Sequence, residues 1–319
     1  MKSLLSIENL SVQIRGDGGT ARILQDVTLG VPRGGTLGVV GESGCGKSTL
    51  LRAVLGILPA AATVPRGAIL FEDRDILTDS AAGVRGRIGY VPQDPYLSLN
   101  PVFRAGDQIL EIMRRHAKGS RADHAARLIA LFRAVQLPEP EAALGKYPHQ
   151  FSGGQRQRLL IAAALACDPA LVVADEPTTA LDVTTQREIL GLLRRLTVER
   201  GLSLLFVTHD FGVLAAVCDR VAVLYAGQVA EVGPTRAVLD DPQHPYTRLL
   251  LACHPDRATD IGGIPGTVPA ATAQPGGCRF HPRCPLARPA CAAASPPMVA
   301  LGEDRAVACP FHAEAFALA

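Results

Sequence analysis

The feature that most constrains this chain is a glycine-rich turn between an apolar run and a stretch of helix-forming residues. Residues 36–40 are apolar enough for a buried strand, and Gly41-Glu-Ser-Gly-Cys-Gly-Lys-Ser48 follows at once. Glycines let backbone N–H groups wrap phosphate oxygens, Lys47 can reach the β- and γ-phosphates, and Ser48 can ligate Mg²⁺. The pattern predicts a strand, a phosphate-binding turn and a helix. Residues predicted to contact ATP here are Gly41, Ser43, Gly44, Cys45, Gly46, Lys47, Ser48 and Thr49.

A second motif places two carboxylates after another buried strand. The apolar run Leu171-Val-Val-Ala ends in Asp175-Glu176. In phosphate-loop ATPases a strand of this kind presents its aspartate to the hydrated Mg²⁺. A glycine-rich turn alone is often only a turn, but the order and spacing of the two motifs favour a nucleotide site in an α/β fold.

A third motif predicts a second phosphate-binding helix start. In Phe151-Ser-Gly-Gly-Gln155, Ser152 can cap a helix and Gln155 stands three residues on as its capping-box partner. Gly153 and Gly154 leave backbone N–H groups bare, which suits a phosphate. Because Lys47 already takes one nucleotide, this second site should serve a nucleotide held by a partner.

With these three motifs the chain resembles the ATP-binding-cassette (ABC) ATPases, whose defining signature is the Ser-Gly-Gly-Gln segment. The resemblance implies an α/β fold: a phosphate-loop (RecA-like) core, an antiparallel β subdomain and an inserted helical subdomain. It also implies head-to-tail dimers with ATP at both seams. A heterodimer with a second, related cassette is favoured over a homodimer.

Further residues match the family's functional elements one by one. Gln93, in Tyr90-Val-Pro-Gln-Asp94, resembles the glutamine loop that touches Mg²⁺ and the attacking water. Asp182 ends a segment similar to the D-loop, and His209 resembles the switch histidine that contacts the γ-phosphate. By the same match Glu176 polarises the water, a general-base role that suits a carboxylate beside bound Mg²⁺.

The periodicity of apolar residues divides the chain. Up to about residue 95 it favours strands, whereas Ile109, Met113, Leu128 and Phe132 lie at helical spacing. We therefore predict an ABC core in residues 1–95 and 156–235, a helical subdomain in 96–155 and a C-terminal extension in 236–319. Some apolar residues of the helical subdomain should form the groove that accepts a permease helix, as in the family. Residues 221 onward and 228–232 should pair across Ala226-Gly227.

Composition and hydropathy exclude several classes. The chain has 319 residues and a net charge of only +2, with basic residues scattered among nearly equal numbers of acids, so no nucleic-acid face is expected. Apolar runs such as Leu159–Cys167 are far short of the roughly 20 residues of a transmembrane helix. The apolar run within residues 1–8 is too brief for a signal peptide. We expect a cytoplasmic protein, peripheral on the inner face of the cell membrane through separate permease subunits.

One family feature is missing near the N-terminus. Related cassettes stack adenine on an aromatic residue before the phosphate loop, yet residues 1–40 contain no Phe, Tyr or Trp. Arg22 falls near that place, and a guanidinium can lie flat on a base. Arg22 is therefore a candidate ATP contact, while an ordinary solvated arginine is the alternative.

The C-terminal part narrows the resemblance. His244-Pro-Tyr-Thr247 resembles the hallmark of the oligopeptide, dipeptide and nickel group of ATP-binding subunits, and the resemblance covers essentially the whole chain. It implies an ATPase that powers an importer of di- or oligopeptides, with two permease subunits and an extracytoplasmic solute-binding protein. An importer ATPase for nickel or another small solute, and a soluble ABC ATPase without a permease, are the alternatives.

Half of the eight cysteines lie in the tail. Cys278, Cys284, Cys291 and Cys309 are separated by gaps of five, six and seventeen residues, which is not the usual zinc-knuckle spacing. The tail resembles the extension of peptide-importer ATPases, some of which hold a [4Fe–4S] cluster. Zinc, with His281 or His312 as further ligands, and no metal at all stay open. Because the cassette core precedes the tail, we expect changes such as Cys291→Ser to leave ATP binding largely intact.

Overall fold

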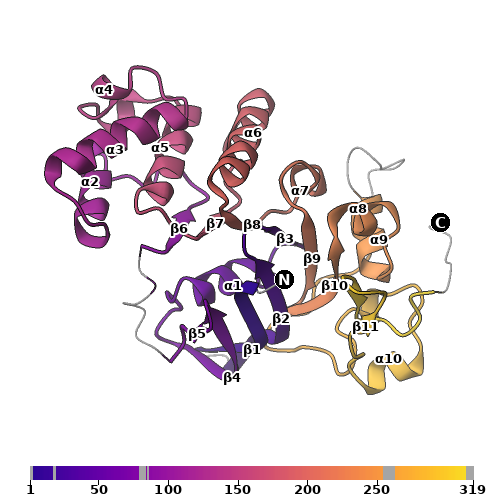
Figure 1. The fold of residues 1–319 in the computed structure, drawn as a ribbon. Coiled ribbons are helices and arrows are strands. Elements are labelled where there is room, and N and C mark those ends of the chain that lie inside the picture. The colour runs from indigo at the N-terminus through magenta and orange to yellow at the C-terminus, as the bar shows by residue number, and fades with distance from the viewer. Residues whose placement is uncertain (1–2, 17–18, 79–83, 85, 254–262, 314–319) are drawn as a thin grey trace. The chain divides into compact units, whose positions relative to one another are not determined.

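The computed structural model describes residues 3–16, 19–78, 84, 86–253 and 263–313. The chain divides into two compact units (Figure 1). The helical unit comprises Met1–Lys2, Pro32–Gly35 and Ser80–Phe206, and the phosphate-loop unit comprises Ser3–Val31, Thr36–Asp79 and Val207–Ala319. Among the described residues, no helix is both long and apolar enough to cross a membrane.

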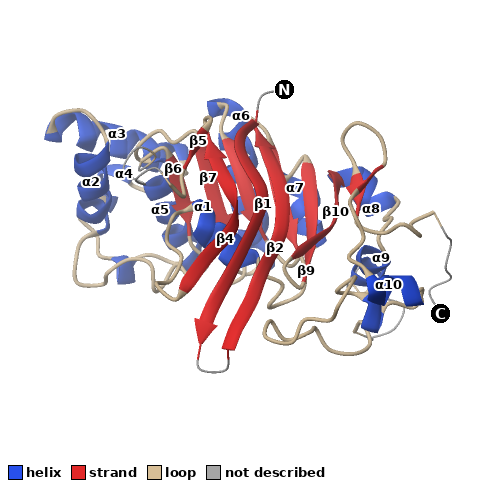
Figure 2. Cartoon of the chain, turned by 90° about the horizontal axis from the view of Figure 1, so that it is seen from below, coloured by secondary structure: helices blue, strands red, loops and turns tan. Residues whose placement is uncertain are grey.

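The phosphate-loop unit begins with an antiparallel sheet of order β2-β1-β4-β5. Its strands are β1 (Ser3–Gly16), β2 (Gly19–Pro32), β4 (Ala62–Phe71) and β5 (Arg74–Asp75). β1 and β4 run side by side along most of their length, from the pair Leu5 and Phe71 onward (Figure 2). Leu10 and Val12 of β1 are fully buried, in a part of the chain where the apolar periodicity favours strands.

The same unit holds the strand that leads into the phosphate loop. β3 (Thr36–Val40) is buried at all five positions and pairs in parallel with β9 (Arg220–Tyr225). β9 turns at Ala226-Gly227 into antiparallel β10 (Gln228–Pro234), which confirms the predicted hairpin. The sheet is therefore mixed. Up to Ala252, the described helices of the unit are α1 (Lys47–Val54), α7 (Phe211–Val217), α8 (Thr235–Asp240) and α9 (Pro245–Ala252).

The C-terminal extension returns to this sheet, which the sequence did not predict. Residues 263–277 contain no helix or strand, as the Gly/Pro-rich composition indicates. Short elements follow: η3 (His281–Arg283), α10 (Pro289–Ala293), β11 (Val299–Ala300) and β12 (Ala306–Val307). β12 pairs with β10 through Val307 opposite Glu231, and β11 pairs with β12. Two-residue strands are too short to show an alternating pattern.

The helical unit contains the strands β6 (Ile88–Val91) and β7 (Leu171–Asp175) and most of β8 (Ser203–Val207). β6 and β7 pair in parallel. The unit's α2 (Ala105–His116), α3 (Arg121–Ala134), α4 (Pro140–Ala143) and α5 (Gly153–Leu165) form one group, with η2 (Pro148–Gln150) before α5 and α6 (Val183–Arg200) after β7 (Figure 1). Ile109, Met113, Leu128 and Phe132 are fully buried, as their helical spacing predicts. The domain boundaries remain a prediction, and the one at 155/156 falls inside α5.

Candidate nucleotide-binding site

The phosphate loop is a tight turn closed on its own lysine. The Lys47 ammonium is buried and donates to the carbonyl oxygens of Gly41 at 2.6 Å and Glu42 at 3.1 Å. Gly46 caps α1 with a φ of 106°, and a Cβ there would lie 2.7 Å from Leu24 Cδ2. Glycine is thus required by backbone conformation and by close approach. At Gly44 no described atom lies within 4 Å of an added Cβ, so this edge of the turn is open.

Cys45 faces inward and packs inside the turn. Its side chain is 1% exposed, and burial raises the pKa of the thiol despite the nearby Lys47 ammonium. The Cys45 carbonyl accepts a hydrogen bond at 2.8 Å from the N–H of Gly227, in the β9–β10 turn. Cys45 therefore stabilises the conformation of the turn.

The other predicted ATP contacts of this unit lie at its surface. Ser48 is exposed in the first turn of α1, and Thr49 is half-buried beside it. His209 is exposed between β8 and α7, which Asp210 caps by accepting from two backbone N–H groups. Arg22 is exposed on β2, and its backbone N–H donates to Ala271 of the extension at 2.9 Å.

In the helical unit the structure brings together Gln93 and Glu176, two residues that the sequence assigned to catalysis. Asp175 and Glu176 stand at the end of β7, both half-buried. A Glu176 carboxylate oxygen accepts from the Thr179 hydroxyl at 3.1 Å and from the Gln93 amide at 3.4 Å. Glu176 also has a φ of 43°, an uncommon backbone conformation for a non-glycine residue that clusters at functional sites.

The signature segment forms the predicted helix cap. Ser152 Oγ accepts from the Gln155 N–H at 3.3 Å, and Gln155 Oε1 accepts from the Ser152 N–H at 3.1 Å, which confirms the capping box. A pocket of about 440 Å³ opens at this helix start. Asp182 lines the same pocket and caps α6 through the Thr185 N–H. The structure thus places the signature segment and the D-loop residue together.

Tyr96 is a pocket residue that sequence reasoning missed. It lines the signature pocket, and the Arg156 guanidinium lies 4.5 Å from its ring centroid. A Cβ on Gly153 would lie 2.9 Å from its hydroxyl oxygen. Arg158, paired with Glu188 at 2.9 Å, also lines the pocket. Nothing in the local sequence marks Tyr96, because it lies more than 50 positions before the signature segment.

The four tail cysteines line one cavity of about 180 Å³. Burial raises the pKa of the Cys278 thiol, and it raises that of Cys284 to about 11. Within the described residues, no group of three or more His, Cys, Asp or Glu side chains is placed to hold a metal ion. The cysteines Cys278, Cys284, Cys291 and Cys309 therefore share a cavity without forming a ligand set.

The His244-Pro-Tyr-Thr segment is built into the sheet by a buried carboxylate. Glu231 of β10 is fully buried and accepts from the backbone N–H groups of Gln243 at 3.1 Å and His244 at 2.9 Å. His244 Nδ1 accepts from the Tyr246 N–H at 3.0 Å and so caps α9. Burial lowers the pKa of His244 to about 3, opposed by a hydrogen bond to the Ala308 carbonyl, so the ring is neutral.

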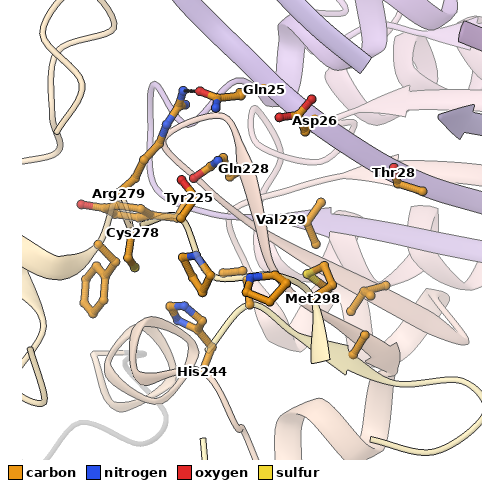
Figure 3. Close-up of a pocket in the computed structure, with 18 of the residues that line it drawn as sticks. Gln25, Asp26, Thr28, Tyr225, Gln228, Val229, His244, Cys278, Arg279 and Met298 are labelled. Carbon is orange, nitrogen blue, oxygen red and sulfur yellow. Dashed lines mark hydrogen bonds between the residues drawn. The ribbon is translucent and has the colours of Figure 1, made fainter. Parts of the chain in front are cut away.

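The extension also packs against the antiparallel strands of its own unit. The Arg279 side chain is buried and donates to the Gln25 side chain on β2 (Figure 3). It also donates to the Ala226 carbonyl. A neighbouring pocket of about 540 Å³ is lined by both parts, including Asp26, Val229 and Met298. The extension is thus an integral part of the phosphate-loop unit.

A phosphate loop on a mixed sheet, a carboxylate pair after a buried strand and a second capped Gly-Gly helix start define a cassette-type ATPase. Comparison with known protein families supports this class. The ABC transporter family matches residues 24–179, and the oligopeptide/dipeptide transporter C-terminal region matches residues 230–291.

Two relatives are similar over nearly their whole length. The dipeptide transport ATP-binding protein DppD of Bacillus subtilis is 41% identical over 317 residues, 97% of this chain and 95% of that protein. DppD of Escherichia coli is 38% identical over 316 residues, 97% of each. This chain therefore belongs to the ABC transporter family, in the group with the oligopeptide/dipeptide C-terminal region. It is an ATPase.

Solved structures resemble the cassette part. The dimeric structure of MJ0796, a bacterial ABC transporter cassette, gives a TM-score of 0.63 at 27% identity and covers 73% of this chain and 99% of that one. The cbiO1 protein from Clostridium perfringens gives 0.66 at 28% identity, covering 76% and 92%. The fold is the ABC ATPase fold. These likenesses leave about a quarter of the chain unmatched.

Proposed function

We propose that this chain is the ATP-binding and ATP-hydrolysing subunit of an importer of di- or oligopeptides. The observation that carries the proposal is full-length similarity to dipeptide transport ATP-binding proteins, in a chain whose phosphate-loop turn is intact. The match to the oligopeptide/dipeptide C-terminal region favours this function over a soluble ATPase without a permease. Nickel or another small solute is the alternative cargo.

The side-chain chemistry of the catalytic candidates suits hydrolysis of ATP. We assign Gly41, Ser43, Gly44, Cys45, Gly46, Lys47, Ser48, Thr49 and Arg22 to ATP binding. Ser48, Asp175 and Gln93 would hold Mg²⁺, which stabilises charge on the phosphates. Glu176 takes a proton from the attacking water while the water oxygen bonds to the γ-phosphorus and the bond to ADP breaks. His209 would contact the γ-phosphate.

The signature pocket supports a second cassette as partner. Ser152, Gly153, Gly154 and Gln155 would receive the γ-phosphate of the partner's ATP, and Asp182 would lie at the seam. The backbone N–H groups at this helix start, the helix dipole and the open pocket all suit an anion. We propose a heterodimer with a related cassette.

An apolar surface on the helical unit supports a permease contact. Leu97, Val102 and Phe103 are between 58% and 84% exposed, which is costly for a free surface. Two permease subunits would cover this surface on the two cassettes, and an extracytoplasmic solute-binding protein would deliver the cargo. The chain would then lie at the cytoplasmic face of the cell membrane.

For the tail we propose a [4Fe–4S] cluster held by Cys278, Cys284, Cys291 and Cys309, with zinc as the alternative. The kind and number of donors fit, since four thiols line a single cavity and four thiolates are the usual ligands of such a cluster. Against it, the described residues contain no preassembled metal group. Binding would require these half-buried thiols to lose their protons.

Uptake by the reconstituted transporter tests the proposal. The chain, a second cassette, two permeases and the binding protein are placed in vesicles, and ATP-dependent uptake of a radiolabelled dipeptide is compared with that of Ni²⁺. Dipeptide uptake that is lost in the Lys47→Ala variant supports the proposal. Uptake of Ni²⁺ but not dipeptide overturns the cargo, and ATP hydrolysis unaffected by Lys47→Ala overturns the nucleotide site.

A further inference from the structure

The C-terminal extension contacts the phosphate loop directly. Both terminal nitrogens of the Arg283 guanidinium donate to the Glu42 carboxylate, at 2.8 Å and 3.1 Å. The Arg283 side chain is only 4% exposed, so this is a largely desolvated, bidentate pair. Glu42 is the second residue of the phosphate-loop motif, 241 positions earlier in the chain.

Tyr246 contacts the same residue from another direction. Its hydroxyl oxygen accepts a hydrogen bond at 2.9 Å from the backbone N–H of Glu42. Tyr246 is fully buried, and burial raises the pKa of its hydroxyl well above the ordinary value, so the group stays neutral. Glu42 is thus held by its side chain and by its backbone.

Glu42 is also part of the lysine arrangement of the turn. Its carbonyl oxygen accepts from Lys47 Nζ at 3.1 Å and from the Cys45 N–H at 3.2 Å. A shift of Glu42 therefore shifts the atoms that set the turn. Its carboxylate would repel the phosphates of ATP if it were left unpaired, and the Arg283 cation offsets that charge.

The two contacting residues are themselves firmly placed. Tyr246 packs against Tyr225 and Phe280, with ring centroids 4.5 Å and 5.3 Å away. Arg283 also donates to the carbonyls of Pro265 at 2.9 Å and Ile264 at 3.0 Å. These contacts suit a positioning role, because a fixed side chain can hold the turn in one geometry.

We propose that Arg283 and Tyr246 are positioning residues for ATP binding, through which the C-terminal extension sets the geometry and charge of the phosphate loop. The proposal rests on the ATPase function proposed above. It differs from the expectation drawn from sequence order, in which the tail lies outside the nucleotide site. The extension is then required for ATP affinity, and this role is separate from any metal that the extension holds.

Steady-state ATPase kinetics of the assembled transporter test the proposal. Arg283→Gln should raise KM for ATP roughly tenfold with a smaller change in kcat, because it leaves the Glu42 charge unpaired. The double variant Arg283→Gln/Glu42→Gln should have a KM within about twofold of that of Glu42→Gln alone, because the uncompensated charge is gone. A merely structural role of Arg283 would not be rescued in this way.

Arg220→Gln is the matched control. Arg220 also pairs with a carboxylate of the extension, Asp304 at 3.2 Å, but at the opposite end of β9 from Tyr225. Its KM for ATP should equal that of the parent. If Arg283→Gln also leaves KM unchanged, or raises it with no recovery on adding Glu42→Gln, the proposal fails.

Tyr246→Phe keeps the test decisive if Arg283→Gln does not fold. It removes one oxygen atom and leaves the Glu42 N–H without its acceptor, so KM should rise about fivefold. Parental KM in a folded Tyr246→Phe protein overturns the role of the hydroxyl. A parental transporter that hydrolyses no ATP would instead overturn the proposed function, before any variant is compared.

Discussion

The hydroxyl oxygen of Tyr246 lies 2.9 Å from the backbone nitrogen of Glu42, which joins the His244-Pro-Tyr-Thr motif to the phosphate loop. The motif therefore has a physical role besides marking a group of transporters. Its proline and its histidine cap begin α9, and the first turn of this helix carries the tyrosine to Glu42.

Glu176→Gln should abolish ATP turnover while ATP still binds. The amide cannot accept the proton of the attacking water, and loss of a general base lowers kcat by roughly 10²- to 10⁴-fold. The measurement is single-turnover hydrolysis alongside equilibrium ATP binding, with Glu199→Gln, at an exposed position of α6 on the same unit, as a control. Hydrolysis at the parental rate would remove Glu176 from the catalytic role.

Gly154→Val should prevent ATP-driven closure of the two cassettes. A Cβ at Gly154 would lie 2.6 Å from Thr185 Cγ2, so the signature helix start must shift. We expect at least a roughly tenfold loss of ATPase activity with ATP affinity retained, since phosphate donors there are misplaced. Gly191→Val is the control, because no described atom lies within 4 Å of a Cβ at Gly191. Equal activities of the two variants would contradict the role of the signature pocket.

His244 should make the fold sensitive to acid. The pKa of the buried ring is lowered to about 3, whereas an unfolded histidine titrates near 6.5. Its contribution is therefore fully present above pH 6.5 and is lost as pH falls toward 3, by up to about 1.4 kcal/mol per pH unit. His244→Asn, which can keep the helix cap, should flatten this dependence in urea unfolding between pH 6.5 and 4. The exposed His149, changed to Gln, is the control; an unchanged slope in His244→Asn would contradict the assignment.

Cys284→Ser should remove the metal from the chain purified without oxygen. The proposed cluster gives about four irons per chain and a broad visible absorption band. Cys253→Ser, a cysteine outside the four-cysteine cavity, should keep the metal. One zinc per chain would favour the zinc alternative. A parental protein without metal would contradict the proposed cluster.

Replacing Leu97 and Phe103 together by Ser should weaken assembly with the permeases. Both side chains are exposed, by 84% and 58%, and their burial in an interface contributes about 1.5–3 kcal/mol each. Co-purification of the permeases should fall while ATP binding by the chain is unchanged. Val198→Ser, on α6 and 74% exposed, serves as the control. Full recovery of permeases by the double variant would place their contact elsewhere.

Much of the fold followed from local patterns. The β3 strand, the β9–β10 hairpin and the Ser152–Gln155 capping box lie where the sequence places them, because each depends on neighbours a few residues away. The strands of the tail, β11 and β12, escaped prediction, since pairing with β10 and not local pattern makes them strands.

The sequence by itself determined the chemistry of the phosphate loop, the carboxylate pair and the signature segment, since those side chains and backbone groups are contiguous. Only the tertiary structure decided that Tyr246 and Arg283 meet Glu42, across 204 and 241 positions. It also placed the four cysteines around one cavity. The physical reason is that such contacts depend on the register of β9, β10 and β12 and on the packing of Phe280 against Tyr225 and Tyr246, and no local pattern encodes these.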